Sequence, residues 1–527
     1  MLLTLLACTD PIPVDTAVPL GPKPVAEAEP AALRRLTSSQ YENAVLDLLG
    51  ADLTLPTSLE PDTAIDGLLS VGASTVSVSA LGVERYEDAA YLLAEQAVEN
   101  PDLYGCTPAG AADSECATSF IEALGRRAWR RPLTSEEVEA LVDLHMLVAQ
   151  DAESFDAGAV YAIAAVLQSP YFLYRVEMGE PDPARPGQRL LTDYEVASRL
   201  SFFLWNTLPD DELMDAADAG ELSTDDGLRS QATRMLADQR AHDGVRNLFD
   251  ELYELYLLES VTKDPTIFTM ASPELGPAAR EETLLTVERL VFVEDGDYRD
   301  LFTSRRTFVD RRLAALYGVP APGEDGFGEV ILPADGGRSG LLGQASTLML
   351  HSHSTRSSAT LRGIFIRETL LCQEIPAPPS NVDTSIPEAD ATSPTLRERV
   401  ASHLEDPTCS GCHQVMDPPG LALENFDGIG RWRTIENGAV IDASGNLDGE
   451  EYDDAMGLNR ALWNHEGVAR CFTTKVMQYA VGHQMGAGEV ALRNWLETSF
   501  KLEGHSVQNL LLEVVTSDAF RHVGDWE

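Results

Sequence analysis

Basic residues are scarce in this chain. Its 527 residues include 38 Lys and Arg against 85 Asp and Glu, so the formal net charge is −47 at pH 7. A surface this acidic repels phosphate backbones and anionic lipid headgroups. We therefore expect neither nucleic-acid binding nor polybasic docking to a membrane. No apolar run reaches the roughly 18 residues that cross a bilayer, so no transmembrane helix is expected.

Aromatic residues make up only 7 % of the chain, but the apolar fraction of 44 % and the charged fraction of 23 % are ordinary for a folded protein. The chain is longer than a single hydrophobic core usually organises. Two to four structural units are therefore the expectation.

The N-terminus lacks the charged segment that normally opens a signal peptide. Even so, Leu5-Leu6-Ala7-Cys8 resembles a bacterial lipobox, in which the cysteine is lipidated after cleavage. The alternative is a disordered N-terminus with an accidental match. In either case the Pro-rich segment over residues 9–30 is expected to be an unpacked tether, because proline and small residues build no core.

Cysteine is also rare, with seven residues in the whole chain. Cys106 and Cys116 lie in a loop rich in Gly, Ala and Asp, where a disulfide would staple a loose connection. Cys372 and Cys471 either pair with each other or remain as buried thiols. This use of cysteine suits an oxidising, extracytoplasmic compartment.

Helix signals dominate the pattern. Thr37, Thr134 and Thr192 each stand three residues before a Gln or Glu and just before an apolar run, which predicts capped helix starts. A further helix is predicted over 155–177, broken near Pro170. Strand signals are few and short, at 328–332 and 438–442. The predicted fold class is mainly α, a multi-module helical protein with a few short β-strands.

Linkers rich in proline and acidic residues divide the chain. The expected organisation follows chain order: 1–30 signal or lipobox and Pro-rich tether, 31–178 N-terminal helical modules, 189–318 central helical module, 327–433 module ending in the motif described next, and 434–527 C-terminal helical module.

One motif in the C-terminal part carries chemistry. Cys409, Cys412 and His413 form Cys-x-x-Cys-His, the attachment signature of c-type haem. Two cysteines on one helical turn present both thiols to the two vinyl groups of a porphyrin edge. The adjacent histidine then serves as the proximal iron ligand. The motif predicts one covalent haem c. A following helix is expected to stop at Pro418 and Pro419.

Three other interpretations of the motif stay open. A redox-active pair of the thioredoxin kind needs a βαβ context, which the sequence does not indicate. A zinc site needs further Cys or His ligands, which only Cys372, Cys471 or distant histidines supply. A structural disulfide between Cys409 and Cys412 is the simplest alternative.

The sixth iron ligand is unknown from the sequence. Met416 is close in sequence, but one turn from His413 it is too near to reach the opposite face of the porphyrin. The other distal candidates are His351, His353, His483, Met477 and Met485. An open sixth position favours small-ligand chemistry, and a filled one favours electron transfer.

Several segments together resemble the planctomycete-type cytochrome-like family of large bacterial extracytoplasmic proteins. The resemblance covers nearly the whole chain from Leu33 to Val523. The segments that carry it are 34–50, 120–141, 167–177, 191–213, 305–320, 338–372, 409–433 and 441–449. The resemblance implies a mostly helical fold of consecutive modules of unknown function with one haem-c-like site, which carries over to Cys409, Cys412 and His413.

The expected function is an extracytoplasmic c-type haem protein with an electron-transfer or oxidoreductase role. It is expected to be anchored by a lipid at Cys8, on the periplasmic or cell-surface side, and that anchor is its expected membrane attachment. The expected partner is a redox protein or a small oxidant. The alternative function is a non-redox helical binding or structural protein in which Cys409 and Cys412 form a disulfide.

Overall fold

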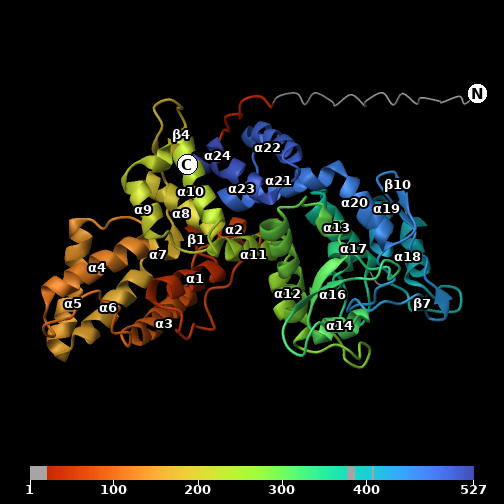
Figure 1. The fold of residues 1–527 in the computed structure, drawn as a ribbon, viewed down its shortest axis with the longest axis horizontal. Helices are drawn as coiled ribbons and strands as arrows, with labels where there is room; N and C mark the ends of the chain where they lie inside the picture. The colour runs from red at the N-terminus through yellow and green to blue at the C-terminus, as the bar shows by residue number, and fades with distance from the viewer. Residues whose placement is uncertain (1–19, 377–385, 406–408, 527) are drawn as a thin grey trace, which may run out of the picture.

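The computed structural model describes residues 20–376, 386–405 and 409–526. Within these residues the chain is mainly helical with a few short strands, so the predicted fold class is confirmed. Figure 1 shows an N-terminal helical group at one end, the α19 region at the other, and the C-terminal helices between them along one side.

The elements follow chain order. The N-terminal part holds β1 (Arg34–Arg35), α1 (Ser38–Leu49), α2 (Leu69–Gly72), α3 (Ala80–Ala97), α4 (Ser114–Trp129), α5 (Ser135–Ala152), α6 (Phe155–Gln168), α7 (Pro170–Leu173) and β2 (Tyr174–Arg175). The central part holds β3 (Glu180–Pro181), β4 (Gln188–Leu190), α8 (Asp193–Leu204), α9 (Asp211–Asp218), η1 (Glu221–Ser223), α10 (Asp225–Leu236), α11 (Arg240–Leu252), η2 (Leu255–Glu259), α12 (Leu275–Glu288), η3 (Arg289–Glu294), α13 (Asp300–Thr303), β5 (Arg306–Val309) and α14 (Arg311–Tyr317).

The next part holds β6 (Gly328–Ile331), α15 (Gly340–Gly343), α16 (Ala345–Leu350), α17 (Ala359–Ile364), η4 (Phe365–Leu370), α18 (Leu396–Glu405) and α19 (Ser410–Leu421). The C-terminal part holds β7 (Ile435–Glu436), β8 (Ala439–Val440), β9 (Gly445–Leu447), β10 (Glu450–Tyr452), α20 (Ala455–Asn464), α21 (Glu466–Val481), η5 (Ala487–Glu489), α22 (Val490–Leu502), α23 (Val507–Val515), α24 (Asp518–Arg521) and β11 (His522–Gly524).

The predicted helix starts are confirmed. Thr37, Thr134 and Thr192 cap α1, α5 and α8, and in each case the Gln or Glu three residues later bonds back to the cap backbone. Two backbone N–H groups that have no partner within the helix are thereby satisfied by side chains within four residues of sequence. This is why local pattern alone locates these helices.

The helix predicted over 155–177 breaks before Pro170, as expected, but it does not reach residue 177. Tyr174 and Arg175 form β2, which pairs antiparallel with β1. Backbone pairing with a distant segment overrides the local helical pattern here. The two predicted strands are confirmed in shorter form, since β6 pairs with β5 and β8 pairs with β7.

Two large hydrophobic cores organise the described residues. One lies mainly in the N-terminal part and also includes Phe202 and Leu208 of the central part. The other extends from Ala26 to Val523 and gathers side chains from the central, α17–α19 and C-terminal parts. These later parts therefore share one core and are not separately packed units.

A buried ion cluster joins the parts. Arg34 of β1 and Arg199 of α8 each place a guanidinium nitrogen 2.5 Å from Oε2 of Glu177. Arg199 also donates to the carbonyl of Phe520 at 2.9 Å. Burial raises the pKa of Glu177, but the arginines outweigh it and hold the pKa at about 2. The N-terminal, central and C-terminal parts therefore meet at a permanently charged carboxylate.

Residues 20–30 pack against the C-terminal part, so the expected unpacked tether is wrong for this segment. Lys23 pairs with Glu513 at 2.8 Å, and Ala26 and Ala28 are buried. Beside the segment, a Cβ added at Gly488 would lie 2.6 Å from the Cβ of Glu27. The absence of a side chain at Gly488 allows this close backbone approach, which composition alone does not indicate.

Candidate functional site

The Cys-x-x-Cys-His motif lies at the start of α19. Cys409 is the residue before the first helical position, and its carbonyl accepts the backbone N–H of His413 at 3.1 Å. Cys412 lies one turn further on. Both cysteines are free thiols of intermediate burial. The structure therefore brings the three predicted residues together on one helical turn.

The other described cysteines are paired. Cys106 bonds to Cys116, and Cys372 bonds to Cys471, with Cα–Cα distances of 5.9 and 5.2 Å. The disulfide expected between Cys106 and Cys116 is present, and the interpretation of Cys372 and Cys471 as buried thiols is wrong. Cys372 and Cys471 are also unable to complete a zinc site at the motif, because a disulfide sulfur is not a thiolate ligand.

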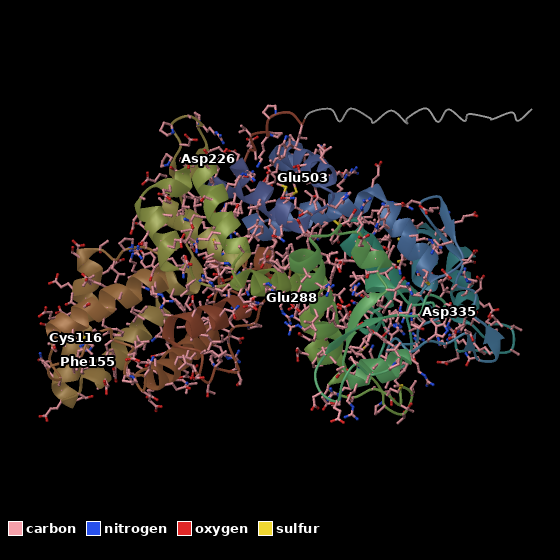
Figure 2. The ribbon with its side chains drawn as sticks, in the orientation of Figure 1. Cys116, Phe155, Asp226, Glu288, Asp335 and Glu503 are labelled. Carbon is pink, nitrogen blue, oxygen red and sulfur yellow. A yellow bond between two sulfur atoms is a disulfide. The ribbon has the colours of Figure 1, made fainter. Side chains whose placement is uncertain are left out.

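The alternative function required a bond between Cys409 and Cys412. In the structure, Cys409 and Cys412 do not form a disulfide with each other. Figure 2 shows Cys116 at the end of the molecule opposite Asp335, so the first disulfide is remote from the α19 half of the chain.

A buried carboxylate orients the motif histidine. Nδ1 of His413 lies 2.8 Å from Oδ2 of Asp417, one turn later on the same helix. The side chain of Asp417 is fully buried, while that of His413 is 18 % exposed. The hydroxyl of Thr360 on α17 donates to the other carboxylate oxygen at 3.1 Å. The carboxylate thereby fixes the orientation of the ring through its Nδ1 atom.

The helix continues through its two prolines, so the predicted stop at Pro418 is wrong. Proline has no N–H, so Pro419 leaves the carbonyl of Val415 without its intrahelical bond. Arg367 of η4 supplies the replacement, because its Nε donates to that carbonyl at 3.0 Å. Arg367 is itself held by Asp448 at 2.8 Å. A side chain distant in sequence thus keeps α19 helical as far as Leu421.

Two glycines allow α17 and α19 to cross in close contact. A Cβ at Gly363 would lie 1.7 Å from the carbonyl oxygen of Met416, and one at Gly420 would lie 1.7 Å from that of Ala359. Neither backbone position tolerates a side chain without movement of the helices. Helix α18 covers the other side through Leu396 and Val400, which pack with Ala359 and Leu421.

The distal candidates are dispersed. Met416 is buried on α19 itself, one turn after His413, so the two residues share one helix. His483 follows α21, and its Nε2 lies 3.0 Å from Glu489. Met477 is buried in the large core, and Met485 packs against that core.

His351 and His353 lie in the turn after α16. His353 is exposed, and its carbonyl accepts from Lys263 at 3.1 Å. The ring of His351 stacks on Phe365 with centroids 4.3 Å apart. Its Nε2 is buried and has no hydrogen-bond partner among the described residues. Burial lowers the pKa of His351 to about 3, so the ring is neutral at physiological pH.

The donor set fits a c-type haem. Two free thiols one turn apart and a neighbouring imidazole, whose Nδ1 is engaged by Asp417, are the groups that covalent haem attachment uses. Within the described parts of the chain, no cluster of three or more His, Cys, Asp or Glu side chains is arranged to hold a bare metal ion.

Sequence reasoning missed Asp417, Thr360 and Arg367. The sequence did indicate Asp417, because a His and an Asp four residues apart lie on the same face of a helix. No sequence pattern indicates Thr360 or Arg367, since their roles depend on how α17 and η4 pack against α19. Cys8 lies outside the described residues. In those residues, no helix has both the length and the apolar character to span a bilayer.

Five family models match the chain in succession, and each is described as a protein of unknown function. They match residues 34–99 (DUF1587), 116–177 (DUF1595), 191–319 (DUF1592), 338–436 (DUF1588) and 448–520 (DUF1585). The motif of α19 falls within the fourth match. Comparisons with curated proteins and with solved structures found no match. The five modules therefore belong to families of unknown function, and their succession supports the multi-module family that the sequence resembles.

Proposed function

We propose that this protein is an extracytoplasmic c-type haem protein with an electron-transfer or oxidoreductase role. One haem c is attached through thioether bonds to Cys409 and Cys412, and His413 is the proximal iron ligand. The observation that carries the proposal is the pair of free thiols on the first turn of α19, in a chain whose other described cysteines are all paired.

The bound haem supplies one-electron chemistry at its iron. The chain contributes position and charge. The carboxylate of Asp417 accepts the Nδ1 proton of His413, which selects the tautomer that has its lone pair on Nε2. Because a hydrogen bond to a carboxylate makes an imidazole more basic, the arrangement favours the oxidised, more positive iron. The crossing with α17 holds the helix that carries these residues.

The compartment and the partner follow from chemistry and charge. Two disulfides support an oxidising environment outside the cytoplasm. Lipidation at Cys8 would anchor the protein to the cell envelope, on the periplasmic or cell-surface side. A net charge of −47 favours a redox partner protein that presents a basic face, because opposite potentials accelerate encounter. A small oxidant is the alternative partner.

The test is expression of the full chain with a periplasmic cytochrome-c maturation system. A pyridine haemochrome spectrum of the c type is expected, with haem staining that survives denaturing electrophoresis. Cys409→Ala and Cys412→Ala should each weaken or abolish the covalent band, and the double variant should abolish it.

The matched control is the double variant Cys106→Ala/Cys116→Ala, which removes two cysteines elsewhere and should keep the stained band. Colourless wild-type protein under these conditions would overturn the proposal, as would a normal c-type spectrum in the Cys409→Ala/Cys412→Ala variant.

A further inference from the structure

A second site lies far from the motif, at the boundary between two modules. A cavity of about 270 Å³ opens between the end of α4, the short helix α7 and the first turns of α8. Its walls come from the modules matched at 116–177 and 191–319. In Figure 1 these elements lie in the half of the molecule opposite α19. The proposed haem chemistry makes no use of this cavity.

Aromatic rings form the wall of the cavity. Trp129 and Tyr171 lie with ring centroids 5.4 Å apart, and Tyr194 completes the lining. The rings are held in place, since Nε1 of Trp129 donates to the carbonyl of Val166 at 3.2 Å and the hydroxyl of Tyr194 donates to Asp218. Tyr171 is 42 % exposed. Rings that are already oriented lose little conformational freedom when a ligand stacks on them.

An unpartnered hydroxyl group also lines the cavity. Ser198 is only 5 % exposed, and its Oγ has no hydrogen-bond partner among the described residues. A helical serine commonly bonds to the carbonyl four residues earlier, and Ser198 does not. A buried polar group left without a partner is costly, so a ligand group that formed a hydrogen bond with this hydroxyl would remove that cost.

The charged side chains around the cavity are already engaged within the protein. Arg130 donates to the carbonyls of Tyr171 and Tyr174 at 2.6 and 2.7 Å. Arg131 lies 4.3 Å from the ring centroid of Tyr171, and its two terminal nitrogens bond to Glu137 at 2.9 and 2.7 Å. Glu195 accepts the backbone N–H groups of Met178 and Thr192, each at 2.7 Å. The hydrogen-bonding groups of these side chains are therefore already used within the protein, which favours an uncharged ligand.

We infer that this cavity binds one uncharged sugar ring, such as a terminal residue of a polysaccharide. The polarised C–H face of a pyranose packs against the electron-rich faces of aromatic rings. Its hydroxyl groups match the free Oγ of Ser198. The volume is just below the roughly 300–1,000 Å³ of sites for drug-sized ligands, which suits a single ring.

The experiment titrates the full chain with the methyl glycosides of glucose, galactose, mannose and N-acetylglucosamine, by calorimetry and by saturation-transfer NMR. At least one glycoside should bind. Tyr171→Ala and Ser198→Ala should each weaken that binding about tenfold or more, with helix content unchanged by circular dichroism.

The matched control is Tyr161→Ala. Tyr161 belongs to the same module as Tyr171 and is 43 % exposed, but it packs on Tyr91 and does not line the cavity. Its affinity for the glycoside should equal that of the wild type. Failure of all four glycosides to bind would overturn the inference. So would equal loss in the control, or preferential binding of the uncharged aromatic probe phenol at the cavity.

Discussion

Nδ1 of His413 lies 2.8 Å from Oδ2 of Asp417, and the carboxyl group is fully buried. Thr360 holds the second oxygen of the same carboxyl group from a different helix. The imidazole of the Cys-x-x-Cys-His motif is therefore fixed both by its own helix and by the helix packed against it. This arrangement is the basis of the first prediction.

Asp417→Asn should raise the reduction potential of the haem-loaded protein. An amide carries no negative charge, so it makes His413 a weaker donor and stabilises the oxidised iron less. The measurement is a spectroscopic redox titration of wild type and variant, both with covalently attached haem. Asp453→Asn is the charge-matched control, because Asp453 is exposed and solvent screens its charge. Equal shifts in the two variants would contradict the assigned role.

Arg367→Met should destabilise the protein by about 1–3 kcal/mol. The variant leaves the carbonyl of Val415 without a donor at the place where Pro419 already supplies none. Chemical denaturation followed by circular dichroism gives the free energy of unfolding. Arg470→Met is the control, since its ion pair with Glu497 is half exposed on the arginine side and such pairs contribute about 0–1 kcal/mol. Similar losses in both would refute the special role of Arg367.

The two disulfides should differ in their effect on stability. Cys372 and Cys471 are separated by 99 positions, whereas Cys106 and Cys116 are separated by 10. The loop-entropy relation gives about 4.7 kcal/mol for the long loop and about 2.7 kcal/mol for the short one. Denaturation of the two Cys→Ala double variants measures both values. A larger loss from the Cys106/Cys116 variant would contradict the prediction.

Stability should fall as the pH rises from about 4.5 to about 7, in part because of Glu282. Burial raises the pKa of Glu282 to about 7, although Thr307 and Tyr317 donate hydrogen bonds to it. The folded state therefore binds a proton in this pH window that the unfolded state has released, so deprotonation favours unfolding. The stabilisation that comes from this bound proton is fully present below the ordinary pKa of 4.5, and it is lost as the pH rises above the folded-state pKa of about 7.

The check is the free energy of unfolding from pH 5 to pH 8 for wild type and Glu282→Gln. The wild type should lose on the order of 3 kcal/mol more than the variant across this window. Glu436→Gln serves as a control because Glu436 is paired with Arg399, so its removal should leave the pH dependence nearly intact. Identical pH profiles for wild type and Glu282→Gln would show that Glu282 does not titrate as expected.

Local features of the chain were predictable. The caps at Thr37, Thr134 and Thr192 depend on contacts within four residues, so the amino-acid sequence alone locates them. The motif at Cys409–His413 is local in the same sense, because one helical turn brings its side chains together. The pairing of Cys372 with Cys471 was open, since it depends on two segments 99 residues apart.

The sequence by itself therefore determined the helical class, the starts of the capped helices and the turn that presents two thiols and an imidazole. Only the tertiary structure decided that α19 runs past Pro419, that Asp417 is buried behind His413, and that residues 20–30 lie on the C-terminal part. The physical reason is the separation in sequence between the residues that interact. A helix cap or a short motif is completed by residues that are neighbours along the chain. The unpaired carbonyl opposite Pro419, the buried carboxylate of Asp417 and the packed backbone of residues 20–30 instead need partners that only the fold brings near.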